Sequence, residues 1–227
     1  MTPAHIINTF CFILPCFALL LLTFKDHLRK PVLMHIAGAI LLYLVIAFYG
    51  SGTYAAYAAF PVKYIILSLS SIILGAVIFD MATGYRLEHG IFIVAIAKCY
   101  AEHVTLLSMY AYFLIHGRLP FYDTFDASLI RAVLTAATFP FICRFFRKSL
   151  RPALDYAVSF SIWSQVWIIP VCNNLLYNMI FSINISSPGS MPDRFFCYIP
   201  PLWVSLTFAT YVLIVKMVIV VMENAAL

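Results

Sequence analysis

The sequence predicts an all-α protein, a polytopic membrane bundle of seven transmembrane helices. Of its 227 residues, 64% are hydrophobic and 10% are charged, whereas soluble domains are nearer half apolar and a quarter charged. The apolar residues form long runs between short polar connections, without the strict alternation of β-barrel strands. Because a backbone that crosses lipid must satisfy its own hydrogen bonds, such runs predict helices.

The apolar runs define the predicted spans. They cover approximately residues 3–24, 32–49, 64–81, 91–115, 127–146, 156–181 and 195–222. We expect residues 1–222 to form one membrane domain and residues 223–227 to begin a cytoplasmic helical extension. Six spans are the competing count, if the short second or third run is re-entrant.

The basic residues predict the topology. The first, third and fifth connections hold Lys25, Arg29, Lys30, Arg86, Arg144, Arg147, Lys148 and Arg151, whereas the other three connections hold Lys63, Arg118 and Arg194. Cytoplasmic loops carry an excess of Lys and Arg, so the N-terminus is predicted outside and the C-terminus inside. The net charge of +5 then reflects orientation in a plasma membrane, and nucleic acid is not an expected partner.

The run 91–115 carries ionisable residues near its middle. Lys98 and Glu102 are spaced i, i+4 and share a helix face, and His103 follows on an adjacent face. Placing an ionisable group at this depth of a bilayer costs free energy, so such groups normally face the bundle interior. We interpret the three residues as a ligand site or switch, or alternatively Lys98 and Glu102 as an ion pair that pins the helix interface. Two ligands, Cys99 and His103, are too few for a metal site, so no metal or cofactor is predicted.

The run 156–181 contains a proline followed by amides. Pro170 lacks an amide hydrogen and predicts a kink, and Asn174 and Asn178 share a face with Asn173 beside them. The amides could line a polar cavity or hydrogen-bond neighbouring helices together. In the first interpretation the cavity would lie near the outer leaflet.

Other residues have predicted structural roles. Pro200 and Pro201 could kink the start of the last span, and Arg131 and Lys216 are expected to act as membrane anchors by reaching the two surfaces. The sequence contains no H-E-x-x-H, no G-x-S-x-G and no glycine-rich phosphate loop. We therefore expect no enzymatic activity from this chain.

The stretch 144–170 resembles a known family. A basic connection with Arg147, Leu150, Arg151 and Pro152 leads into a helix with Trp163, Trp167, Ile168, Ile169 and Pro170. This is similar to the N-terminal membrane sensor modules of bacterial sensor histidine kinases with a GHKL-type ATP-binding domain. The resemblance implies a homodimer, a peptide or small-molecule ligand, and a kinase domain outside this chain that would act on a response regulator.

The residues leave three functional alternatives. A sensor module would pass an extracellular or membrane signal through its last helix to a cytoplasmic kinase. A small transporter, or the substrate-binding membrane subunit of one, would use Lys98 and Glu102 in a midplane site. An assembly protein would bind no ligand.

Overall fold

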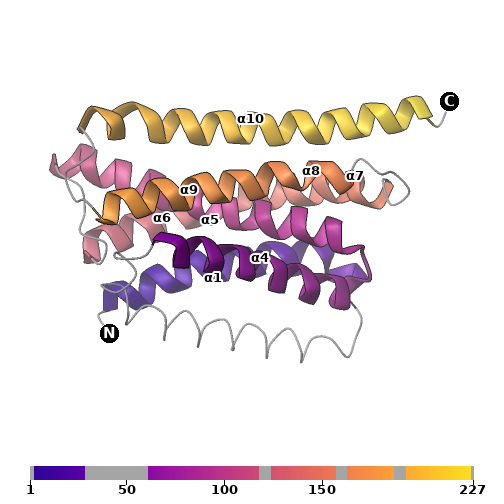
Figure 1. The fold of residues 1–227 in the computed structure, drawn as a ribbon, viewed down its shortest axis with the longest axis horizontal. Coiled ribbons are helices and arrows are strands. Elements are labelled where there is room, and N and C mark those ends of the chain that lie inside the picture. The colour runs from indigo at the N-terminus through magenta and orange to yellow at the C-terminus, as the bar shows by residue number, and fades with distance from the viewer. Residues whose placement is uncertain (1–2, 29–60, 118–123, 157–162, 187–192, 226–227) are drawn as a thin grey trace.

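The computed structural model describes residues 3–28, 61–117, 124–156, 163–186 and 193–225. These residues are almost entirely helical and contain no strand, so the all-α prediction is confirmed for them. The elements are α1 (Pro3–Phe24), η1 (Lys25–His27), α4 (Pro61–Thr83), α5 (Leu87–His116), α6 (Phe125–Phe145), η2 (Phe146–Leu150), α7 (Arg151–Tyr156), α8 (Trp163–Val166), α9 (Ile168–Ser186) and α10 (Asp193–Ala225). Figure 1 shows the long helices running along the longest axis of the molecule, with α10 at one edge of this view.

Four segments are long and apolar enough to cross a membrane. Within the described residues they are Ile6–His27, Leu87–His116, Phe125–Asp155 and Ile199–Val220. This composition is consistent with a membrane protein. The apolar part of α4, Ser68–Thr83, is shorter, and the predicted span 32–49 lies outside the described residues. The count of seven spans and the orientation of the termini therefore stay predictions.

Helix α5 lies at the centre of the bundle and contacts α1, α4, α6, α9 and α10. In the most apolar stretch of α5, 72% is buried inside the fold, whereas the corresponding stretches of the other three candidate spans are 11–28% buried. Small residues allow close packing around it. At Gly90, a Cβ atom would lie only 2.8 Å from the backbone oxygen of Ala76 on α4. Lys98 and Glu102 in the middle of α5 are therefore buried in the interior of the fold.

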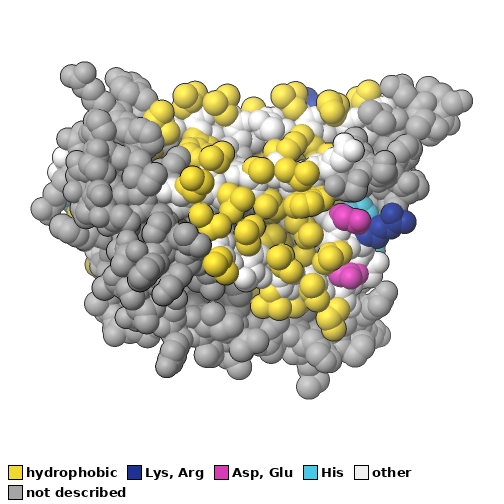
Figure 2. All heavy atoms as spheres, viewed as in Figure 1, with side chains coloured by type: hydrophobic (Ala, Val, Ile, Leu, Met, Phe, Trp, Pro, Cys, Tyr) yellow, Lys and Arg dark blue, Asp and Glu magenta, His cyan; other side chains and the backbone are white. Residues whose placement is uncertain are grey.

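Apolar side chains cover much of the outside. In Figure 2, hydrophobic side chains spread over the middle of the described surface, and acidic, basic and histidine side chains meet at one end. At the junction of η1 and α7, Arg151 pairs with Asp26 at 3.0 Å and with Asp155 at 3.6 Å. Tyr85, between α4 and α5, also donates a hydrogen bond to Asp155. This polar cluster joins three chain segments at one end of the bundle.

The basic connection predicted after the fifth span is helical. Arg144 lies in the last turn of α6, Arg147 and Lys148 lie in the π-helical turn η2, and Arg151 begins α7. Pro152 has no amide hydrogen, and its ring would clash with the carbonyl four residues earlier in a regular α-helix. A wider π turn before Pro152 relieves that clash and lets the chain stay helical.

The prolines have different effects on their helices. The helix is interrupted at Trp167, between α8 and α9, three residues before Pro170. A kink of the helix axis at this position stays a prediction. By contrast, α10 is continuous through Pro200 and Pro201, so these two prolines do not end the helix, and their role as a hinge stays a prediction.

Candidate functional site

Lys98 of α5 is directed toward α4. Its Nζ donates hydrogen bonds to the Ser68 carbonyl at 3.2 Å, to the Ser71 hydroxyl at 3.2 Å and to the Ser68 hydroxyl. The Ser71 hydroxyl in turn donates to the Ser68 carbonyl at 2.7 Å. All three acceptors are neutral oxygens of α4. The side chain is therefore held at a helix interface without a carboxylate among its hydrogen-bond partners.

Glu102 is directed toward α9. It is 1% exposed, and its Oε1 accepts a hydrogen bond of 3.4 Å from Asn178. Its Oε2 is buried and has no hydrogen-bond partner among the described residues. Lys98 and Glu102, both within the described residues, do not form the direct ion pair that their spacing suggested. Neighbouring helices offer each side chain a different partner.

Asn178 connects the two charged residues indirectly. Its Nδ2 donates to the Ser68 hydroxyl at 3.0 Å as well as to Glu102. The Ser68 hydroxyl also accepts from Lys98. A path of hydrogen bonds thus runs from Lys98 through Ser68 and Asn178 to Glu102, and it involves α4, α5 and α9.

Asn174 joins α9 to α5 one turn earlier. It is fully buried, and its Nδ2 donates to the Ala95 carbonyl at 3.0 Å, the Cys99 thiol at 2.9 Å and the Pro170 carbonyl at 2.7 Å. Its Oδ1 is buried, and the described part of the chain offers it no hydrogen-bond partner. Asn174 therefore bonds helices together, as one sequence interpretation proposed, but leaves one acceptor unused.

Asn173 extends the contacts to α10. Its Oδ1 accepts a hydrogen bond of 2.8 Å from the indole Nε1 of Trp203, and its Nδ2 lies 3.4 Å from the Cys99 sulfur and 3.5 Å from the Tyr211 hydroxyl. Tyr211 donates to the Cys99 sulfur at 3.2 Å. The buried thiol of Cys99 is thus the point where side chains of α9 and α10 meet α5.

We call these side chains together the polar network. Its members are Ser68, Ser71, Lys98, Cys99, Glu102, Asn173, Asn174, Asn178, Trp203 and Tyr211. Sequence reasoning identified five of its residues, namely Lys98, Glu102, Asn173, Asn174 and Asn178. It missed the serines of α4, although a pair of hydroxyls at i, i+3 in an apolar run was a usable signal. Nothing in the local sequence marked Cys99, Trp203 or Tyr211 as their partners.

His103 lies outside this network. Its Nδ1 is hydrogen-bonded to the carbonyl of Cys99, one turn earlier in its own helix. The structure therefore does not bring His103 into hydrogen-bond contact with the side chains of Lys98 or Glu102. Among the described residues, no group of three or more His, Cys, Asp or Glu side chains is placed to hold a metal ion.

The prediction that Arg131 reaches the membrane surface is wrong. Its side chain is 3% exposed, and it donates to Asn8 Oδ1 at 2.9 Å and to the Ser108 hydroxyl at 3.3 Å. These acceptors on α1 and α5 hold the guanidinium inside the bundle. Lys216 is exposed on α10, and its role as an anchor stays a prediction.

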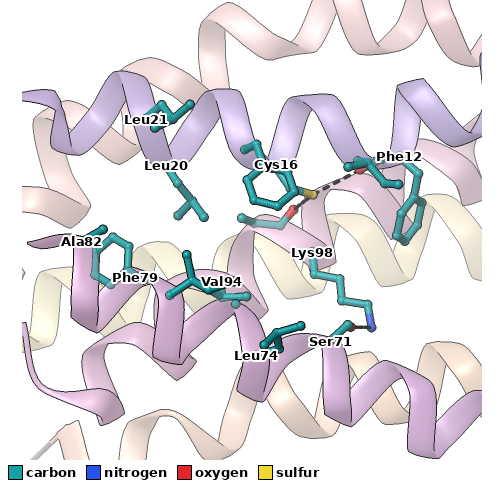
Figure 3. Close-up of a pocket in the computed structure, with 15 residues that line it drawn as sticks. Phe12, Cys16, Leu20, Leu21, Ser71, Leu74, Phe79, Ala82, Val94 and Lys98 are labelled. Atoms are coloured by element: carbon teal, nitrogen blue, oxygen red, sulfur yellow. Dashed lines mark hydrogen bonds between the residues drawn. The ribbon is translucent and has the colours of Figure 1, made fainter. Parts of the chain in front are cut away.

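A cavity of about 120 Å³ lies beside the polar network, between α1, α4 and α5. Figure 3 shows the amine of Lys98 next to Ser71 at one end of the cavity, and Phe79 and Ala82 at the other end. Most of its described lining is apolar, with Leu20 and Leu21 of α1 facing Leu74 and Phe79 of α4. The arrangement combines an elongated apolar space with one basic group.

No family model, curated protein or solved structure matches the chain. The resemblance to the sensor modules of histidine kinases therefore stays a prediction.

Proposed function

We propose that this chain is the membrane sensor module of a two-component histidine kinase. The observation that carries the proposal is the polar network, which joins α4 and the charged middle of α5 to α9 and α10. Its two halves are linked within α9, where Asn178 Nδ2 donates to the backbone carbonyl of Asn174 at 2.6 Å. A signal that alters Lys98 or Glu102 has a physical route to α10, the longest described helix. The resemblance of residues 144–170 supports the same conclusion.

The mechanism we infer is a shift between two arrangements of α9 and α10. A ligand that changes the hydrogen bonds of Lys98 or Glu102 would change those of Asn178, which bonds both Ser68 and Glu102. One turn earlier in the same helix, Asn174 contacts Cys99, and Asn173 contacts Cys99, Trp203 and Tyr211. A ligand shifts such an equilibrium only by its difference in affinity for the two arrangements. Sliding or rotation of α10 would carry the change to a kinase.

The proposal includes a topology and partners. The N-terminus would lie outside and the C-terminus inside a bacterial plasma membrane, crossed by seven helices, because the basic residues favour this orientation. The chain would act as a homodimer on a peptide or small-molecule ligand. A kinase region beyond Leu227 would act on a response regulator.

Distances between α6 and α10 test this proposal. Spin labels would be placed at Phe141 and Leu213, which are 77% and 65% exposed, in a variant that keeps only the buried Cys99 among its six cysteines. In lipid nanodiscs, Glu102→Gln and Lys98→Met should each move the label–label distance by about 1–2 Å or more, the scale of helix shifts in switching proteins.

The control is Arg86→Gln, which removes an exposed charge outside the polar network. It should leave the distance distribution unchanged. If Glu102→Gln and Lys98→Met also leave it unchanged, the network does not couple the charged residues to α10, and the sensor mechanism fails. Reading the coding DNA after Leu227 provides an independent test, because a neighbouring GHKL-type kinase region is expected.

One observation favours a transporter as the second candidate. The break between α8 and α9 lies in the helix that faces the buried carboxylate of Glu102, and transporters commonly place broken helices at their substrate sites. A gene for an ATPase or an energy-coupling component next to this one, together with an unchanged α6–α10 distance in the variants above, would favour transport over sensing.

A further inference from the structure

The cavity between α1, α4 and α5 has the shape of a slot with one polar end. Ser71 and Ala82 mark its two ends on α4, and the three helical turns between them span roughly 16 Å at 1.5 Å per residue. Leu74, on the wall of the slot, is 42% exposed. The wall of the slot on α4 therefore extends to the outer surface of the described residues.

The described lining of the slot carries a basic group and no acidic one. Lys98 is the one charged side chain in its described lining, and Glu102 is not part of that lining. The hydrogen-bond partners of the Lys98 amine are neutral oxygens of Ser68 and Ser71. Hydrogen bonds between two ionised groups are shorter and stronger than neutral ones. An anionic oxygen would therefore be a better partner for Lys98 than the hydroxyl it now contacts.

We propose that the slot binds a long-chain fatty acid. The carboxylate would accept hydrogen bonds from Lys98 Nζ and from the Ser71 hydroxyl, and the acyl chain would lie between Leu20 of α1 and Phe79 of α4. The carboxyl group and the Lys98 amine can hydrogen-bond as carboxylate and ammonium or as carboxylic acid and neutral amine.

The walls favour this chemistry over other membrane ligands. A peptide would bring amide groups into an apolar slot that offers them almost no partners, and unpaired amides are costly to bury. A phospholipid carries two acyl chains and a bulky headgroup, whereas the described lining of the slot has one basic group at one polar end. A methylene chain needs no hydrogen bonds, and a carboxylate is a compact anionic headgroup.

This inference deepens the proposed function, because it names a ligand class for the proposed sensor. The effect of the ligand on signalling rests on the proposed function. A carboxylate that draws the Lys98 amine away from Ser68 would change the hydroxyl that Asn178 also contacts. Binding itself does not depend on any output through α10.

Photo-crosslinking tests the site directly. The purified chain in nanodiscs of zwitterionic phospholipid would be irradiated with a diazirine-bearing long-chain fatty acid, and the labelled residues would be mapped by mass spectrometry. We expect saturable labelling on α1 and α4 around the slot. An unlabelled fatty acid should compete at least about tenfold better than the alcohol of equal chain length, because only the acid forms a charged hydrogen bond with Lys98. Equal competition by acid and alcohol would overturn the proposal without any variant.

Variants sharpen the test. Lys98→Met should weaken competition by the acid by about tenfold to a hundredfold, whereas Lys216→Met, which removes the exposed lysine of α10, should leave it unchanged. Ala82→Leu should shift the preferred acyl chain toward shorter lengths, because it fills the far end of the slot. Labelling that is insensitive to both Lys98→Met and Ala82→Leu, or equal labelling of the slot by a diazirine phospholipid, would overturn the fatty-acid assignment.

The α6–α10 distance separates this inference from the proposed function. If the acid binds but the distance does not change at saturation, the site stands and the sensor mechanism fails. If Glu102→Gln moves α10 but no acid binds, the sensor mechanism stands and the ligand class is wrong.

Discussion

The hydrogen bond between Trp203 and Asn173 should be a measurable part of the coupling between α9 and α10. The indole Nε1 lies 2.8 Å from Asn173 Oδ1, a favourable N–H···O length. Interhelical polar contacts in a membrane protein average about 0.6 kcal/mol and reach about 1.7 kcal/mol. Because this contact is short and partly buried, we expect a coupling energy of about 1 kcal/mol, which is roughly a fivefold change in an equilibrium constant.

A double-mutant cycle measures this coupling. Trp203→Phe, Asn173→Ala and the double variant would be compared with the unsubstituted chain by SDS-induced unfolding in mixed micelles, followed by far-UV circular dichroism. The cycle cancels the apolar surface that each substitution removes and leaves the pairwise contribution. We expect the two single losses of unfolding free energy to exceed, when added, the loss in the double variant by about 1 kcal/mol.

The matched control pairs Asn173 with Tyr211. Their side chains are 3.5 Å apart, at the limit of a hydrogen bond, so a Tyr211→Phe cycle should give less than about 0.5 kcal/mol. A Trp203 coupling below about 0.2 kcal/mol, or one no larger than the Tyr211 coupling, would refute this reasoning. It would mean that α10 is held to the bundle by apolar packing and not by the polar network.

Three further predictions concern packing and charge. Gly90→Ala should lower the unfolding free energy by about 1–3 kcal/mol, because its Cβ would lie 2.8 Å from the backbone oxygen of Ala76 and 3.2 Å from its Cα. Gly75→Ala meets side-chain atoms of Val94, the nearest at 2.8 Å, and no backbone atom, so it should cost less in the same SDS titration. Arg131→Met should leave the unfolding free energy unchanged or raise it, because the buried guanidinium is bonded to neutral oxygens and an apolar replacement removes its desolvation cost; a loss above about 2 kcal/mol would contradict this. Burial, and then the hydrogen bond and charge of the acceptor carboxylate on α7, raise the pKa of the Tyr85 hydroxyl above its usual value of about 10. The folded state thus holds this proton more tightly, so the associated stability is fully present below about pH 10 and is lost as the pH rises further. Tyr85→Phe should flatten that decline in thermal unfolding across alkaline pH, and an equally steep decline would show that other groups cause it.

The helices could be predicted because their signals are local. The run 91–115 anticipated α5, and Gly117 stands just after it with a positive φ of 66° and a hydrogen bond from its amide to the Phe113 carbonyl at 2.8 Å. Glycine is common at this position because it adopts the left-handed conformation without strain. By contrast, the helical path through Arg147 and Lys148 was missed, since basic residues between apolar runs are also typical of loops.

The partners of the buried polar groups could not be predicted, because they come from distant parts of the chain. Spacing placed Lys98 and Glu102 on one face of a helix, but Ser68 lies 30 residues from Lys98 and Asn178 lies 76 residues from Glu102. Arg131 was misplaced for a related reason. Whether its face of α6 meets lipid or other helices depends on Asn8, which is 123 residues away.

Two unused acceptors distinguish the polar network from simple helix bonding. Glu102 Oε2 and Asn174 Oδ1 are both buried and lack a hydrogen-bond partner within the described segments, although most buried polar atoms in native proteins have one. An unpaired buried acceptor is costly, and the cost is larger for a charged group. A network that only joined helices would be more stable with these acceptors paired. Under the proposed sensor mechanism, a new donor or a displaced Lys98 amine would pair one of these acceptors, and we expect the resulting movement to reach α10 through the Asn173–Trp203 hydrogen bond.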